Sequence, residues 1–500
     1  MLPGSHSSEK KAGLLHWAHR VLEECDKASA GFAADPVHDL RVAIRRCRSM
    51  ADGFLSVDPD PAWKDMKRLA KPLFSSLGEL RDAQVMSEWV TKLSASGDAV
   101  SESLLAALAD KEAALKTAAQ EALADFDRER WETLNAHLAQ RTDRVPLEGL
   151  VFQHLALERW TEAHELHRQA LRNRSAVGYH QLRIGIKRFR YTVENFLPSR
   201  HQQWARNLRD LQDALGEVHD FDVLRAMIRA HADIPTEERL HWNTRIMEER
   251  QKRLDFYREI MLGKNSLWKM WRAELPSGAT LEQAALEKLR SWASFLDPDI
   301  PHSAHVTRIA QELFDGLSQC GMLNLAPEYR RILTAGAILH EIGRHKSTSG
   351  HLKRAYRMIR QMKPPLGWTE EEMQCVAVVA RYHRGALPAA GNSSFVGLSK
   401  KRRAALMPVI GVLRLANAID DDHKQSILRV SIERRNGTAV LYGQGLQERS
   451  PSAERIARAR YLLETVCGLA ILIRPLPAKT TTSARTIKRP LRTAAATTPS

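Results

Sequence analysis

The most constraining feature of this sequence is an internal repeat. Residues 37–54 read VHDLRVAIRRCRSMADGF and residues 179–196 read YHQLRIGIKRFRYTVENF, and they align without a gap at an offset of 142. In each copy the apolar residues recur every three or four positions, which predicts an amphipathic helix with one buried face. The predicted buried residues are Leu40, Ile44, Cys47, Ala51 and Phe54 in the first copy, and Leu182, Ile186, Phe189, Val193 and Phe196 in the second.

The opposite face of each repeat helix carries positive charge. Like charges one turn apart destabilise a helix by roughly a few tenths of a kcal/mol each. A row of arginines can bind several successive phosphates of an extended polyanion, because each guanidinium can donate two hydrogen bonds to phosphate oxygens. The alternative is a solvated basic face, or arginines paired with acids inside the bundle. The residues are His38, Arg41, Arg45 and Arg48 in the first copy, His180, Arg183, Lys187 and Arg190 in the second, with Arg46 and Arg188 beside them.

A second element follows each copy of the repeat. It reads SLGELRDAQVM from Ser76 and ALGEVHDFDVL from Ala214. Its Leu-Gly step allows close helix approach. Its recurring acids are predicted to hold the arginines across the bundle: Glu79, Asp82, Glu217 and Asp220.

The pattern of the whole chain predicts a mainly α protein. Leu, Ala, Glu, Arg and Gln dominate the helical segments, and strand-like alternation is confined to short pieces near the C-terminus, two of them joined by an Asn436-Gly437 turn signal. The expected parts are a helical region at 8–262, a linker at 263–279, a second, mainly helical domain at 280–475 with β pieces at 428–432, 438–442 and 470–473, and a disordered basic tail at 476–500.

Charge and cysteine usage limit the partner and the compartment. The 75 Lys and Arg residues against 59 Asp and Glu give a net charge of +16, which implies an anionic partner without separating DNA, RNA, anionic lipid and inorganic polyphosphate. The five scattered cysteines form no C-x-x-C pair, which fits a reducing cytoplasm. Residues 1–11 lack the apolar stretch of a secretory signal, and residues 466–473 are too few to span a bilayer. We therefore expect a cytoplasmic protein that does not engage membranes.

The repeat resembles the CHAD domain, the conserved histidine α-helical domain, over roughly residues 8–262. The match is strong for VHDLRVAIRRCR in the first copy and for its counterpart in the second. Cys47 stands where a larger aliphatic residue is usual, and Gln181 replaces an acid. The resemblance implies a pair of pseudo-symmetric helical bundles, a basic groove between them, and inorganic polyphosphate as the ligand.

The C-terminal half contains an altered metal-binding pattern. An HD phosphohydrolase holds its metal with a His, an adjacent His-Asp pair and a later Asp, which are ligands that suit divalent metals. This chain has His305, then His340 followed by Glu341, and Asn417 at the last position. Asp420 and Asp421 lie about one turn further on and offer a substitute. The doubtful metal ligands are thus His305, His340, Glu341 and Asp420; no cofactor is required by this interpretation, and Mg²⁺ or Mn²⁺ is the candidate if one binds.

Further residues resemble the C-terminal HD-type domain of the exopolyphosphatase and guanosine pentaphosphate phosphatase family. The matching stretches are SGHLKRAYRMI at 349–359 and ARYHRGALP at 380–388. In that family this domain mainly helps to bind the polyanion, and hydrolysis belongs to a separate actin-like domain that the helical pattern of residues 1–262 does not match. The residues implied in polyanion binding are Lys353, Arg354, Arg357, Arg381, His383 and Arg384.

The leading hypothesis is therefore a polyphosphate-binding protein with two polyanion-binding parts, associated with polyphosphate granules. The first alternative is a metal-dependent phosphohydrolase acting on polyphosphate or a phosphorylated nucleotide. The second is a protein that binds nucleic acid non-specifically, although the basic stripes lack the interleaved aromatic residues on which bases stack.

Overall fold

A computed structural model describes residues 13–95, 98–231, 234–389, 391–447 and 451–476. The chain divides into two compact units. Unit 1 holds residues up to 298 together with 341–374, and unit 2 holds residues 299–340 together with those from 375 onward. The tail expected at 476–500 lies outside the described residues except for Leu476.

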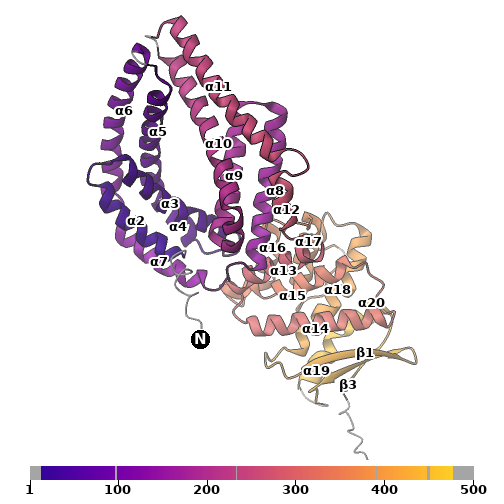
Figure 1. Cartoon of the computed structure of the whole chain (residues 1–500). Helices are drawn as coiled ribbons and strands as arrows, with labels where there is room; N and C mark the ends of the chain where they lie inside the picture. The colour runs from indigo at the N-terminus through magenta and orange to yellow at the C-terminus, as the bar shows by residue number, and fades with distance from the viewer. Residues whose placement is uncertain (1–12, 96–97, 232–233, 390, 448–450, 477–500) are drawn as a thin grey trace, which may run out of the picture. The chain divides into compact units, whose positions relative to one another are not determined.

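Unit 1 consists of helices (Figure 1). They are α2 (Leu14–Ala28), α3 (Ala34–Phe54), α4 (Ala62–Leu69), α5 (Lys71–Leu93), α6 (Ala99–Ala124), α7 (Arg128–Thr142), α8 (Leu150–Asn173), α9 (Ala176–Phe196), α10 (Pro198–Ala230), α11 (Thr236–Met261), α12 (Leu267–Ala273) and α13 (Gly278–Ser294), with η1 (Ile342–His345) and α16 (His351–Gln361) from the later segment. The segment 263–279, expected as a linker, contains α12, whose Trp268 and Trp271 are buried in the core of unit 1.

The sequence repeat becomes a structural repeat. Helices α3 and α9 each have 21 residues and begin and end at equivalent positions of the two copies. The first half packs α2 on α3, α3 on α5 and α5 on α6, and the second half packs α8, α9, α10 and α11 in the same order. Contacts of α3 with α9 and of α5 with α10 join the halves. We call α3, α5, α10 and α9 the four-helix ring, because each contacts the next and the last contacts the first (Figure 1).

The apolar stripes of both repeat helices are buried, as predicted. Where α3 crosses α9, Phe54 lies edge-on to Phe196 with ring centroids 5.5 Å apart, and Phe196 stacks on Phe152 at 4.2 Å. Gly53 makes this crossing feasible, since a Cβ atom there would lie 2.3 Å from the Phe196 ring. The two basic stripes are therefore fixed relative to each other by a tightly packed aromatic contact.

Unit 2 is helical with a small sheet. Its helices are α14 (Ile300–Gln319), α15 (Glu328–Leu339), α18 (Lys400–Ile419), α19 (Pro451–Ala459) and α20 (Tyr461–Cys467), with the short η2 (Ser393–Phe395), and α17 (Glu370–Arg381) runs from unit 1 into unit 2. The strands are β1 (Arg429–Arg435), β2 (Thr438–Gln444) and β3 (Ile471–Pro475). The order is β1-β2-β3, with β2 antiparallel to β1 and parallel to β3. Asn436 and Gly437 both have positive φ, which confirms the predicted hairpin turn.

The fold class is the one that the sequence predicts: helices throughout, followed by short strands near the C-terminus. Among the described residues, no helix is long and apolar enough to cross a membrane.

Candidate functional site

The basic stripes of α3 and α9 face the same side of the four-helix ring. Arg41, Arg45 and Arg183 all act electrostatically on the half-buried Lys187. Burial, followed by these three guanidinium groups, lowers the pKa of Lys187 to about 7. Arg45 of α3 also lies over the Tyr191 ring of α9, so the first stripe reaches the helix that carries the second, as the predicted convergence of the two stripes requires. We call Arg41, Arg45, Arg183 and Lys187 the ring cations.

The ring cations have little internal compensation. In the part of the chain that the structure describes, no carboxylate lies within ion-pair distance of Arg45, Arg183 or Lys187, and the buried Nε atoms of Arg45 and Arg183 have no hydrogen-bond partner. Asp82 and Asp220 act on the cations only at longer range. A buried donor without a partner costs about 1–3 kcal/mol, and more when it is charged, so the arrangement favours an anion that these groups can bind.

The acids of the second repeated element are placed near the ring but do not neutralise it. Burial is the main cause that raises the pKa of Asp220 to about 6, although Arg183 and a hydrogen bond from Trp89 act in the opposite direction. Glu217 bonds Arg253 of α11 at 2.5 Å, away from the ring cations. Glu217 therefore holds an arginine, as predicted for these acids, but this arginine is Arg253 and not one of the ring cations.

Aromatic rings position the guanidinium groups of α3. Arg41 and Arg48 both lie over the Phe74 ring, at 5.1 and 5.0 Å from its centroid, and Arg45 lies over Tyr191 at 5.1 Å. The Nη1 atom of Arg41 also donates to the Phe74 carbonyl at 3.3 Å. In each ring, guanidinium groups thus occupy space over the aromatic face on which a nucleobase would otherwise stack.

The remaining predicted residues differ in how many hydrogen bonds and ion pairs they make within the protein. Arg46 is an internal link, because it bonds Glu194 and Asn195 of α9 and lies over Trp17. Its repeat counterpart Arg188 bonds Glu162 at 2.8 Å and keeps a side chain that is 55% exposed.

Arg48 and Arg190 are partly engaged as well. Arg48 donates to the Lys67 carbonyl at 2.8 Å, and the Arg190 Nε atom lies 3.8 Å from a Glu194 oxygen.

The two predicted histidines lie at the same end of their helices, next to basic residues that sequence reasoning did not single out. His38 is exposed beside Arg81, and burial followed by Arg81 and Arg45 lowers its pKa. His180 contacts His219, with the Nδ1 atoms 3.2 Å apart. Arg81 and His219 occupy the same position of the second repeated element, and this shared basic position was the signal that could have revealed them.

In unit 2 several histidines gather at the ends of helices. The rings of His302 and His340 are 5.5 Å apart, and those of His340 and His383 are 4.7 Å apart. The Asp420 carboxylate bonds the Nδ1 atom of His302 at 2.8 Å. His305, the predicted first ligand, is one helical turn further along α14, with its Nδ1 atom 3.1 Å from an Arg308 nitrogen. His302 was missed, although its place three residues before His305 put it on the same helix face.

The hydrogen bonds of these histidines fit a ligand role. The Nδ1 atoms of His340 and His383 lie 2.6 and 2.7 Å from carbonyl oxygens, which only accept, so these nitrogens carry the protons and Nε2 keeps the lone pair that a metal would need. Asp420 serves the same purpose for His302 and is thus an orienting residue. Imidazoles suit first-row transition metals better than Mg²⁺.

The boundary between the units falls at the peptide bond after His340. Glu341, which belongs to unit 1, is fully buried and lies 3.8 Å from His351 of the same unit. Side chains of metal-ligand type thus occur in each unit, considered by itself. Asn417, at the later predicted ligand position, is buried in α18.

The residues implied in polyanion binding by the C-terminal half are spread over both units. Lys353 and Arg384 are exposed. Arg354 donates to the carbonyls of Gly343, Ser347 and Ser349 and so holds the loop before α16.

The other residues of this group are Arg357, which is exposed, Arg381, which lies over the Tyr382 ring, and His383, which belongs to the buried histidine group.

Fold and site together define an all-helical repeat protein with a cationic ring, followed by a smaller domain with a three-stranded sheet. Residues 14–229 match the family model of the CHAD domain, and residues 287–441 match that of the Ppx/GppA phosphatase, domain III. The chain therefore contains a CHAD domain followed by a Ppx/GppA domain III. A solved structure, the crystal structure of the CHAD domain from the plant Ricinus communis, is 22% identical with a TM-score of 0.40, over 51% of this chain and 90% of that chain. No curated protein matches.

Proposed function

We propose that this protein binds inorganic polyphosphate in the four-helix ring. The observation that carries the proposal is the convergence of the ring cations, two of which have buried guanidinium nitrogens that lack partners among the described residues. Like charges held together at partly buried positions oppose each other, and a chain of phosphates would relieve this repulsion at every position. The presence of a CHAD domain and a Ppx/GppA domain III agrees with a polyphosphate-related role.

The contacts of the ring favour polyphosphate over single-stranded nucleic acid. Proteins that bind single strands without sequence preference stack bases on exposed aromatic side chains. Here guanidinium groups of α3 already lie over the rings of Phe74 and Tyr191. Nucleic acid would therefore bind through its phosphates alone, weakly and with strong salt dependence. Association with polyphosphate granules would follow from the same site.

The proposal is tested by replacing Arg41, Arg45, Arg183 and Lys187 together with Ala. Each charged hydrogen bond contributes about 1.5–3 kcal/mol before coupling, so polyphosphate affinity should fall by about 100-fold or more. Folding should survive, because the buried stripes are unchanged. The measurement is calorimetric titration with polyphosphate, with circular dichroism to verify the fold and DNA as a competitor at the same salt concentration.

A charge-matched control removes four exposed cations of unit 1 that lie outside the helices of the ring: Lys111, Arg130, Lys264 and Lys269. This variant should bind nearly as well as the wild type. Equal losses in both variants would mean that only net charge matters, and an unchanged affinity in the folded ring variant would refute the proposal.

A further inference from the structure

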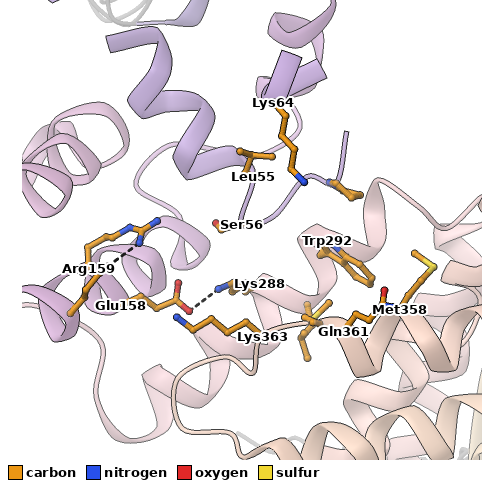
Figure 2. A pocket seen from close by; sticks show the side chains of 14 residues that line it. Leu55, Ser56, Lys64, Glu158, Arg159, Lys288, Trp292, Met358, Gln361 and Lys363 are labelled. Atoms are coloured by element: carbon orange, nitrogen blue, oxygen red, sulfur yellow. Dashed lines mark hydrogen bonds and ion pairs between the residues drawn. The ribbon is translucent and has the colours of Figure 1, made fainter. Parts of the chain in front are cut away.

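Two cavities of unit 1 border the repeat helices and share one residue. The larger, of about 800 Å³, lies among the ends of α3 and α16 and the helices α4, α8 and α13 (Figure 2). The smaller, of about 310 Å³, lies among α3, α4, α8 and α9. Arg159 of α8 lines both, so the two cavities adjoin each other at this side chain.

The smaller cavity also adjoins the four-helix ring. Tyr191 forms part of its wall, and the guanidinium of the ring cation Arg45 lies over the Tyr191 ring. Arg188 lies in the same wall and is more than half exposed. Its repeat counterpart Arg46 is instead bonded to Glu194. A polyphosphate chain that extends from Arg45 into this cavity would thus meet Arg188 and then Arg159.

The walls of the two cavities have surplus positive charge. Their six cations are Lys64, Lys67, Arg159, Arg188, Lys288 and Lys363, against three acids, Asp52, Glu158 and Glu162. Glu162 bonds both Arg159 and Arg188, at 3.1 and 2.8 Å, so one carboxylate serves two guanidinium groups.

Within the larger cavity the charges lie on opposite walls. Glu158 pairs with Lys288 at 2.8 Å. Figure 2 shows Lys64 entering from one side and Lys288 and Lys363 from the other. Within the described chain Lys64 and Lys363 have no ion-pair partner, and both are exposed.

We infer that these cavities extend the polyanion site, so that one phosphate chain runs from the ring past Tyr191 and Arg159 to the lysines of the larger cavity. This inference rests on the proposed function and adds a chain-length preference to it. Lys288 and Lys363 belong to the stretch matched by the Ppx/GppA domain III, yet they lie in the same compact unit as the ring. A polyphosphate chain long enough to reach both the ring and the larger cavity gains the contacts in the cavity without a second loss of translational freedom.

The test compares tripolyphosphate with long-chain polyphosphate. The wild type should bind one molecule of the long chain more tightly than one molecule of tripolyphosphate. This difference in affinity should exceed the statistical gain that a long chain has from offering more phosphates at which to bind. In Lys64→Ala/Lys363→Ala the affinity for the long chain should fall by about tenfold or more, whereas tripolyphosphate affinity should not change. The dependence of the long-chain affinity on salt should weaken as well, by about 1.5 units of the log–log slope for the two lost contacts.

A matched control removes two exposed lysines elsewhere in unit 1, Lys111 and Lys264, and should keep the long-chain advantage. Arg159→Gln interrupts the path at the residue that the cavities share and should also lower only long-chain affinity. If the Lys64/Lys363 variant keeps the full advantage of the control, the extended site is refuted while the ring site stands. If wild-type protein binds neither ligand, the proposed function itself fails.

Discussion

Lys187 is the ring cation whose charge depends on pH near neutrality. Its pKa is lowered to about 7 by burial and by the neighbouring guanidinium groups. Bound phosphates stabilise the ammonium form, so binding above pH 7 takes up a proton. Affinity should fall as pH rises from about 7 to about 9, by up to tenfold per pH unit for one coupled proton. Calorimetric titration across this range measures the effect.

The stability of the unliganded protein should change in the opposite direction. Between the lowered pKa of Lys187 in the fold and its ordinary value of 10.5, the unfolded chain binds more protons, so the free energy of unfolding rises with pH. Lys187→Arg keeps the charge at all these pH values and should remove both dependences. An affinity that falls equally with pH in Lys187→Arg would contradict the role of Lys187.

At the residue scale the sequence predicted the types and spacing of the ring cations but not how each would be used. Arg46 and Arg188 are equivalent in the repeat, yet only Arg46 meets Glu194 and Trp17. That difference depends on which helix packs against each copy, and a repeat pattern has no information about it. The same reason explains why His302 was missed: both it and His305 fit the helix face, and only the position of Asp420 distinguishes them.

At the element scale, the second repeated element brings α5 close to an arginine of α3. A Cβ atom on Gly78 would lie 2.6 Å from the Nη1 atom of Arg41, whereas one on the equivalent Gly216 would meet nothing within 4 Å. Gly78→Ala should therefore displace Arg41 and weaken polyphosphate binding by about threefold to tenfold, within the range expected for one charged hydrogen bond.

Gly216→Ala is the matched control. Both substitutions place Ala in a helix interior, where it is more favourable than Gly by about 1 kcal/mol, so neither should lose stability through helix propensity. Binding titrations and thermal melts of the two variants separate the effects. Equal affinities in both variants would show that the contact between Gly78 and Arg41 does not position the guanidinium.

The repeat helices and the late strands could be predicted because their periodicity is local. Helices α3 and α9 show the 3.6-residue pattern, and the hairpin is set by Asn436 and Gly437, whose positive φ values require such residues. The role of residues 263–279 could not, because Gly, Ser and Pro flank a short helix whose two tryptophans are buried only by partners distant in the sequence. Tertiary packing overrides local composition there.

At the scale of the whole molecule, the two proposed activities, binding and hydrolysis of polyphosphate, make different demands on unit 2. We predict that purified protein releases no phosphate from polyphosphate when Mg²⁺, Mn²⁺ or Co²⁺ is added. Metal-assisted hydrolysis needs a cation held firmly enough to activate water or to neutralise the phosphoryl oxygens. In unit 2 the donors are mainly imidazoles, which carry no negative charge, and the Asp420 carboxylate is already engaged by His302 and by the backbone nitrogen of Gln425 at 2.6 Å.

The charge balance of unit 2 makes the prediction specific. Asn417 is neutral at the position where the HD pattern has Asp, so one negative charge that would retain a divalent ion is lost. Asn417→Asp should therefore raise metal affinity, measured by calorimetry or by the thermal shift on adding metal, since a ligand that binds only the folded state raises the melting temperature. If the wild type instead turns over and His340→Ala abolishes the turnover, the protein is a phosphohydrolase, and the histidine group of unit 2 is its catalytic centre. If neither the wild type nor Asn417→Asp hydrolyses polyphosphate and only Asn417→Asp gains metal binding, polyanion binding is the function that remains for the molecule.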